Sequence, residues 1–164
     1  EQFRTLKQNF NTTGQYNDED RSYVEFKRME SKAILTEGIS KKKISAIWKY
    51  PSYLFKLVVF DMMGHYATNP LRVMVSILVS YSFFSLMVAF IVSFTDAEVI
   101  SSYDDTSIGM IGRSFYYTAI TFLTIGYGDF YPTGSLRFLS GIIGFSGLFL
   151  LSYFTVSFVR KVLR

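Results

Sequence analysis

The chain has 164 residues, of which 49% are hydrophobic and 18% aromatic, and its formal net charge is +4. It contains no cysteine, which excludes a disulfide framework and a thiolate metal site. Its single histidine argues against a histidine-based metal site or catalytic triad, and no pairing of a nucleophile with a base is discernible. We therefore expect a protein that is not an enzyme and that carries no cofactor.

Residues 1–43 predict an N-terminal helical segment. Residues 1–17 are polar and indicate a loop-like start. The acidic residues 18–20 suit the positively polarised N-terminus of a helix. This helix is expected to run to about Leu35 and to stop at Gly38, a residue type common just beyond helix ends.

Residues 41–43 are three consecutive lysines. A solvated linker and a contact with lipid phosphates are both open readings of this cluster, and we favour the lipid contact.

Residues 44–69 predict an amphipathic helix that lies in the membrane interface. The stretch is rich in aromatic residues, but Lys49, Lys56 and Asp61 interrupt it. A third membrane span would bury charges in hydrocarbon, whereas a helix in the interface keeps them in water at far lower cost. We favour the interfacial helix.

Two uncharged runs of 22 residues each follow, at residues 73–94 and 138–159. As helices they reach about 33 Å, enough to cross a hydrocarbon core of about 30 Å. A pair of buried helices in a soluble bundle is the alternative, but uncharged runs of this length favour a membrane. The pattern predicts a first span at 71–94 and a second at 136–160.

The charge distribution predicts how the spans are oriented. Residues 1–72 hold 12 of the 17 lysines and arginines, whereas residues 96–137 hold five acidic residues against two basic ones. Basic flanks lie on the cytoplasmic side, so we expect a multi-pass protein of the cell membrane with both termini in the cytoplasm. The basic excess then suits anionic lipids of the inner leaflet and not nucleic acid. Neither span has a regular arginine repeat, so we expect no voltage sensor.

The segment between the spans contains a polar loop, residues 95–112, and then residues 113–123, which have helical spacing. Eleven helical residues are too short to cross a bilayer, so this helix is expected to enter partway and return. It ends in the sequence Thr-Ile-Gly-Tyr-Gly at residues 124–128. A backbone whose successive carbonyls face one axis needs positive φ angles, which Gly126 and Gly128 adopt without strain.

This five-residue sequence resembles the Thr-Val-Gly-Tyr-Gly selectivity filter of potassium channels, with Ile125 as another β-branched residue in place of valine. The chain thus resembles the potassium channel superfamily, bacterial type with two spans per subunit. The resemblance covers residues 70–160 and assigns a pore domain to 70–164. It implies an all-α membrane protein in which a pore helix and filter lie between two spans. It also implies that four identical subunits conduct potassium passively.

The resemblance also implies the site residues. The carbonyls of Thr124, Ile125, Gly126 and Tyr127 would bind K⁺, the only bound ion expected, and Gly128 completes the filter.

Further residues would support the filter. Tyr116 and Tyr117 stand where many relatives carry a tryptophan pair, and with Tyr127 they are expected to form an aromatic cuff. Thr121 matches a common pore-helix threonine. Asp129 follows the filter, but the buried glutamate with which it pairs in some relatives is Ile120 here.

Glycines recur in the second span at residues 141, 144 and 147. They are explained equally well by close helix packing and by a hinge that lets the inner helix bend. Gly147 matches the family's inner-helix glycine if the segment after the filter is one residue shorter here, and Gly144 is the second hinge candidate.

The detached pore of a voltage-gated channel remains open, although the aromatic helix at 44–66 does not resemble a remnant of a voltage sensor. Two further alternatives also remain open. A non-selective cation channel of the same fold usually replaces the filter tyrosine, which is intact here as Tyr127. A membrane module with a vestigial, non-conducting filter is the other. A potassium-uptake transporter is disfavoured, because such proteins fuse four repeats and usually keep one filter glycine.

Overall fold

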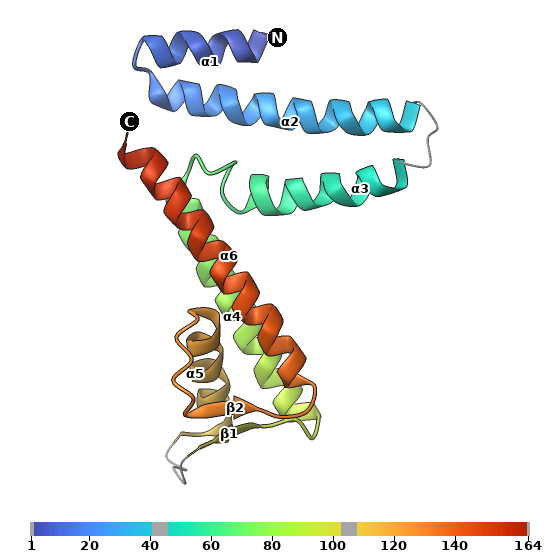
Figure 1. Ribbon diagram of the computed structural model, residues 1–164, viewed down its shortest axis with the longest axis vertical. Helices are drawn as coiled ribbons and strands as arrows, with labels where there is room; N and C mark the ends of the chain where they lie inside the picture. Colours follow the sequence, from blue (N-terminus) through green and yellow to red (C-terminus); the bar gives the residue numbers. More distant parts are fainter. Residues whose placement is uncertain (1, 41–45, 103–107, 164) are drawn as a thin grey trace. The chain divides into compact units, whose positions relative to one another are not determined.

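The computed structural model describes residues 2–40, 46–102 and 108–163, with side chains described for 2–37, 50–102 and 108–163. Most of these residues are helical (Figure 1). The elements in chain order are α1 (Gln2–Thr12), α2 (Tyr16–Ser40), α3 (Ala46–Phe55), the π-helix η1 (Lys56–Met62), α4 (Pro70–Phe94), β1 (Val99–Ser101), α5 (Met110–Phe122), β2 (Phe130–Pro132) and α6 (Leu136–Val162).

The contacts divide the chain into two compact units. The N-terminal unit consists of Glu1–Val73 together with Val156–Arg164, and the central unit consists of Met74–Thr155. The last residues of α6 thus pack with the N-terminal helices, although the rest of α6 belongs to the central unit.

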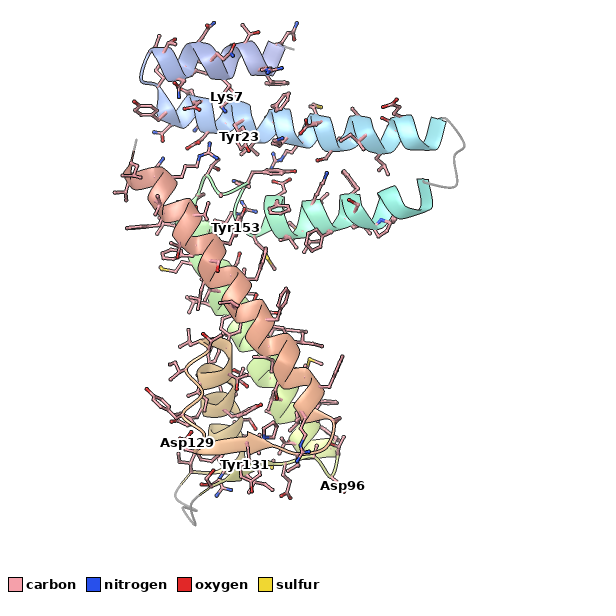
Figure 2. All side chains as sticks on the ribbon, viewed as in Figure 1. Lys7, Tyr23, Asp96, Asp129, Tyr131 and Tyr153 are labelled. Atoms are coloured by element: carbon pink, nitrogen blue, oxygen red, sulfur yellow. The ribbon has the colours of Figure 1, made fainter. Side chains whose placement is uncertain are left out.

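The expectation of a loop-like start is wrong, because residues 2–12 form α1 alongside α2 (Figure 1). An isolated polar helix of this length is marginal in water, so its stability comes from α2. Gly14, at φ +72°, allows the chain to reverse between the two helices. Asn11 donates a 3.0 Å hydrogen bond to Glu19, and Lys7 lies over the ring of Tyr23 (Figure 2).

Helix α2 continues past the predicted stop at Gly38 and ends at Ser40. A glycine inside a helix costs only about 1 kcal/mol relative to alanine, which the packed helix tolerates.

The single helix expected over residues 44–69 is also interrupted. It is α-helical to Phe55 and then π-helical, with Met63 N–H donating to the Val58 carbonyl five residues back at 3.2 Å. The chain next reverses through His65, Tyr66 and Ala67, all at positive φ. The lysines at 41–43 lie outside the described residues.

Helices α4 and α6 are the two described helices that are long and apolar enough to cross a membrane, at 25 and 27 residues. They begin and end within two residues of the predicted spans. Only 11% of the apolar window of α4 and 22% of that of α6 are buried within the chain. Apolar helices this exposed need lipid or neighbouring chains to cover them.

A two-stranded antiparallel sheet joins the segment before α5 to the segment after it. Val99 pairs with Pro132 and Ser101 with Phe130. The predicted all-α fold has only a polar loop here, so these strands are an addition to it. Their pairing brings the loop against the residues that follow the candidate filter.

Candidate functional site

Helix α5 carries the chain to the candidate filter. It begins at Met110, one turn earlier than predicted, and ends at Phe122. One face is fully buried, including Ser114, Thr118 and Phe122. The Phe122 ring lies 6.4 Å from that of Tyr81 and 6.3 Å from that of Phe84, both on α4. This packing fixes the end of α5, and with it the start of the filter.

The backbone of the candidate filter alternates in handedness. Thr124, Gly126 and Gly128 have φ angles of 56°, 59° and 77°, whereas Ile125 and Tyr127 do not have positive φ. In such an alternation successive N–H groups turn to one side and successive carbonyls to the other. Gly126 and Gly128 therefore adopt the conformation that the sequence argument required, and Thr124 adopts it at the cost of some strain.

The N–H groups at the start of this segment point back at α5. The Ile120 carbonyl accepts hydrogen bonds from Ile125 N–H at 2.8 Å and from Gly126 N–H at 3.2 Å, and the Thr121 carbonyl accepts one from Thr124 N–H at 3.1 Å. These bonds hold the N–H side of the filter against the helix, which leaves the carbonyl side free to meet a cation. In the described part of the chain, no three His, Cys, Asp or Glu side chains are placed to hold a metal ion.

Asp129, directly after the filter, has a partner that the sequence analysis missed. The Tyr116 hydroxyl donates to its Oδ2 at 2.7 Å, and its Oδ1 accepts from the Phe130 N–H at 3.1 Å. The Tyr116 ring packs edge-on against Phe130, with centroids 5.5 Å apart. Asp129 lies beside β2 in Figure 2. A phenol thus serves here in place of the buried glutamate of some relatives.

The other two tyrosines of the expected cuff lie differently. Tyr117 is 3% exposed and its hydroxyl is hydrogen-bonded to Ser140 of α6, so it joins α5 to α6. Tyr127 is 69% exposed in the single chain. The cuff therefore stays a prediction, one that requires neighbouring chains around Tyr127. Ser140 could not be singled out in advance, because a serine in an apolar span has no distinguishing pattern.

The glycines of α6 differ in their surroundings. A Cβ at Gly147 would overlap the carbonyl of Phe122 and lie 2.7 Å from its carbon. At Gly144 it would meet the Thr121 carbonyl at an ordinary 3.6 Å, and at Gly141 it would meet nothing within 4 Å. Gly147 is thus needed for the close approach of α6 to the end of α5. This observation favours the packing explanation at Gly147, and the hinge stays a prediction.

Comparison with known proteins agrees with the site. The family model described as an ion channel matches residues 73–164, more than half of the chain. No curated protein and no solved structure matches. The chain belongs to the ion channel family, and its resemblance to the potassium channel superfamily is confirmed. With its two apolar helices it is a membrane protein.

Proposed function

We propose that this chain is one subunit of a potassium-selective channel in which four identical copies surround one pore. The observation that carries the proposal is the alternating backbone of Thr124–Gly128, which follows a short helix between two spans. Dehydrated K⁺ needs rings of oxygens in place of its water shell. The carbonyls of Thr124, Ile125, Gly126 and Tyr127 supply these oxygens, and K⁺ is the only bound ion required.

The dimensions of α5 support a re-entrant arrangement. Its 13 residues span about 20 Å, less than the hydrocarbon core of about 30 Å. A backbone with free carbonyls is tolerated at membrane depth only where protein surrounds it or it lines a polar cavity. This chain supplies one such strand, so four chains, identical or closely related, are needed to close a ring around an ion.

The N-terminal unit supports an interfacial position for α3 and η1. Tyr50, Leu54 and Met62 are exposed, whereas Asp61 turns to α2 and is paired with Arg28 at 2.8 Å. An element with an exposed apolar face and a neutralised charge suits the interface, with anionic lipids of the inner leaflet as partners. Both termini then lie in the cytoplasm of a cell-membrane protein, as the charge distribution predicts.

Opening requires α6 to move. The single chain has an uninterrupted α6 from Leu136 to Val162, and Gly147 is the position at which a bend would release α6 from Phe122. Gly144 lies one turn earlier and can share the bend. Neither span carries an arginine repeat, so these two helices are proposed to contain no voltage sensor.

Ion flux through purified protein in liposomes tests the proposal. We expect potassium to pass and sodium to be excluded, and Tyr127→Asp to abolish this preference. The matched control is Tyr131→Asp, which places the same charge on β2, outside the filter. Equal passage of both ions would identify a non-selective cation channel of the same fold. If neither the wild type nor any variant designed to open the gate passes ions, the result would indicate a non-conducting membrane module.

A further inference from the structure

Ser102 touches the candidate filter from outside. It directly follows β1, and its hydroxyl donates a 2.7 Å hydrogen bond to the carbonyl of Gly128, the last filter residue. Its own N–H donates to the Asp129 carbonyl, also at 2.7 Å. Two successive carbonyls at the filter exit are thus held by one residue of the outer loop.

These bonds continue the ladder between β1 and β2. Ser101 pairs with Phe130, so the strands place Ser102 next to Asp129 and Gly128. On the other side of the same segment, Tyr116 holds the Asp129 carboxylate at 2.7 Å. The end of the filter is therefore held by hydrogen bonds both from α5 and from the outer loop.

We propose that Ser102 is a positioning residue for ion selection, a role that rests on the proposed potassium conduction. A hydroxyl on the Gly128 carbonyl fixes the peptide plane between Gly128 and Asp129. Gly128 has no Cβ and adopts positive φ, so without this bond the backbone turns easily at this position. Rotation there would carry the neighbouring Tyr127 carbonyl away from the outermost ion.

The effect should depend on ion occupancy. A bound cation stabilises the arrangement that binds it, so K⁺ and the Ser102 hydroxyl hold the same backbone conformation. When external potassium is abundant, the bound ion is enough to keep the filter backbone in this conformation. When external potassium is scarce, the Ser102 hydroxyl is needed to keep it there. A residue needed only for folding would show no such dependence.

The test measures potassium flux into liposomes after incubation in low and in high external potassium. Ser102→Ala is expected to lose roughly threefold or more of its flux in low potassium, the effect of one hydrogen bond per subunit, and to match the wild type in high potassium. Ser102→Thr keeps the hydroxyl and should behave as the wild type. Thr133→Ala is the matched control, because that hydroxyl bonds the Glu98 backbone in the same region.

Two failures are distinguishable. If the wild type does not prefer potassium over sodium, the proposed function fails. If the wild type is selective and Ser102→Ala equals it at both potassium concentrations, only the assignment of Ser102 is overturned. Equal losses for Ser102→Ala and Ser102→Thr would also overturn it.

A separate cluster, within the N-terminal unit, holds the end of α6. Arg160 donates to Asp20 of α2 at 3.0 Å, and its guanidinium lies 4.7 Å from the ring centre of Tyr23. It also donates to the Tyr66 carbonyl at 3.4 Å, in the left-handed turn before α4. The neighbouring Lys161 donates to Asn17 at 3.0 Å.

The Asp20–Arg160 pair at the centre of this cluster is largely shielded from water. The side chain of Asp20 is 11% exposed and that of Arg160 is 24% exposed, whereas most of the other paired charges in the described part of the chain are more open. Removing one member of a shielded pair leaves the other charge without compensation, so such pairs resist separation.

From these contacts we infer that the cluster is a clasp that holds the channel closed. Its residues belong to α2, to the turn before α4 and to the cytoplasmic end of α6. Any bend at Gly147 displaces that end of α6, because the helix is continuous from Gly147 to Val162. An opening motion that carries this end of α6 away from α2 and from the turn before α4 must therefore break the bonds to Asp20 and Asn17 and the contact with Tyr23.

Flux measurements test the clasp. Arg160→Gln and Asp20→Asn are each expected to raise potassium flux roughly threefold or more, with the charge-reversed pair Asp20→Arg and Arg160→Asp returning towards the wild type. Arg21→Ala is the matched control, since that side chain is 85% exposed and lies 3.8 Å from Asp18. Unchanged or lower flux in both single variants, with the assembly intact, would overturn the clasp.

Cross-linking provides a readout that does not depend on conduction. The chain has no cysteine, so Asn17→Cys with Lys161→Cys forms a unique thiol pair. A short bifunctional thiol reagent with a reducible linker should join the two residues within one chain and lower the flux until reductant is added. Failure to cross-link would overturn the clasp even in a conducting channel. Efficient cross-linking in a protein that shows no selective flux even after reductant is added would count against the proposed function alone.

Discussion

The two units of this chain are stabilised in different ways. In the N-terminal unit, charged side chains join the elements: Arg28 to Asp61, Arg160 to Asp20 and Lys7 to Glu19. In the central unit, helices α4, α5 and α6 meet through aromatic rings, a glycine and neutral hydroxyls. Even the one carboxylate beside the filter, Asp129, is held by a phenol.

The difference follows from the solvent. Ion pairs are tolerated where water can still reach the charged groups. Where water cannot reach them, desolvation costs several kcal/mol for each ion. A unit that lies in hydrocarbon must therefore gain its specificity from shape and from neutral hydrogen bonds. The four predictions below test this contrast.

The largest effect is expected at Gly147. Gly147→Ala places a methyl group against the Phe122 carbonyl, so α6 must move from α5, at a cost of about 2–3 kcal/mol. Gly141→Ala meets nothing within 4 Å and should be neutral or stabilising by up to about 1 kcal/mol. Thermal unfolding in detergent compares the two. Equal stability of both variants would contradict the close packing.

Next in size is the tie between α2 and η1. The Asp61 carboxylate accepts hydrogen bonds from Arg28 Nη2 at 2.8 Å and from Arg28 Nε at 2.9 and 3.2 Å. Asp61→Ala should destabilise the N-terminal unit by about 2 kcal/mol, and high salt should narrow the gap to the wild type. Hydrogen exchange of the η1 amides measures this. Asp18→Ala, with a side chain 49% exposed, is the control and should change little.

A smaller loss of unfolding free energy is expected for Tyr116→Phe, which removes the hydrogen bond to Asp129. A hydrogen bond to a charged group contributes about 1.5 kcal/mol, and salt should not change this loss, because the donor is neutral. Melting curves at low and high ionic strength check both points. A salt dependence like that of Asp61→Ala would show that charge interactions stabilise both units alike.

The smallest effect concerns pH. Burial lowers the pKa of His65 from its ordinary value of 6.5, and Arg72 and Arg28 lower it further, against the opposing charges of Asp61 and Glu25. As pH falls, His65 is therefore protonated in the unfolded chain before it is protonated in the folded one. The contribution of His65 to the free energy of unfolding should fall slightly as pH drops below 6.5 and should not change at higher pH.

The His65→Gln variant should lose this part of the pH dependence. Neutral His65 also accepts a 2.7 Å bond from Arg72, which protonation removes. Identical pH–stability profiles of the wild type and the variant would contradict the prediction.

Sequence alone predicted the features that depend on local pattern. The two spans follow from uncharged runs of 22 residues, and their observed bounds differ by at most two residues from those expected. The positive φ of Gly126 and Gly128 follows from the absence of a Cβ. Neither result requires knowledge of which segments meet.

Tertiary structure decided the features that depend on which segments meet. Residues 2–12 are polar, and they are helical because α2 lies beside them. Three hydrogen bonds at the site join residues that are far apart in the sequence. Tyr116 and Asp129 are 13 residues apart, Tyr117 and Ser140 are 23 apart, and Ser102 and Gly128 are 26 apart. No periodicity in the sequence encodes such a pairing, because a hydrogen bond between distant residues is fixed only when packing brings the two atoms together.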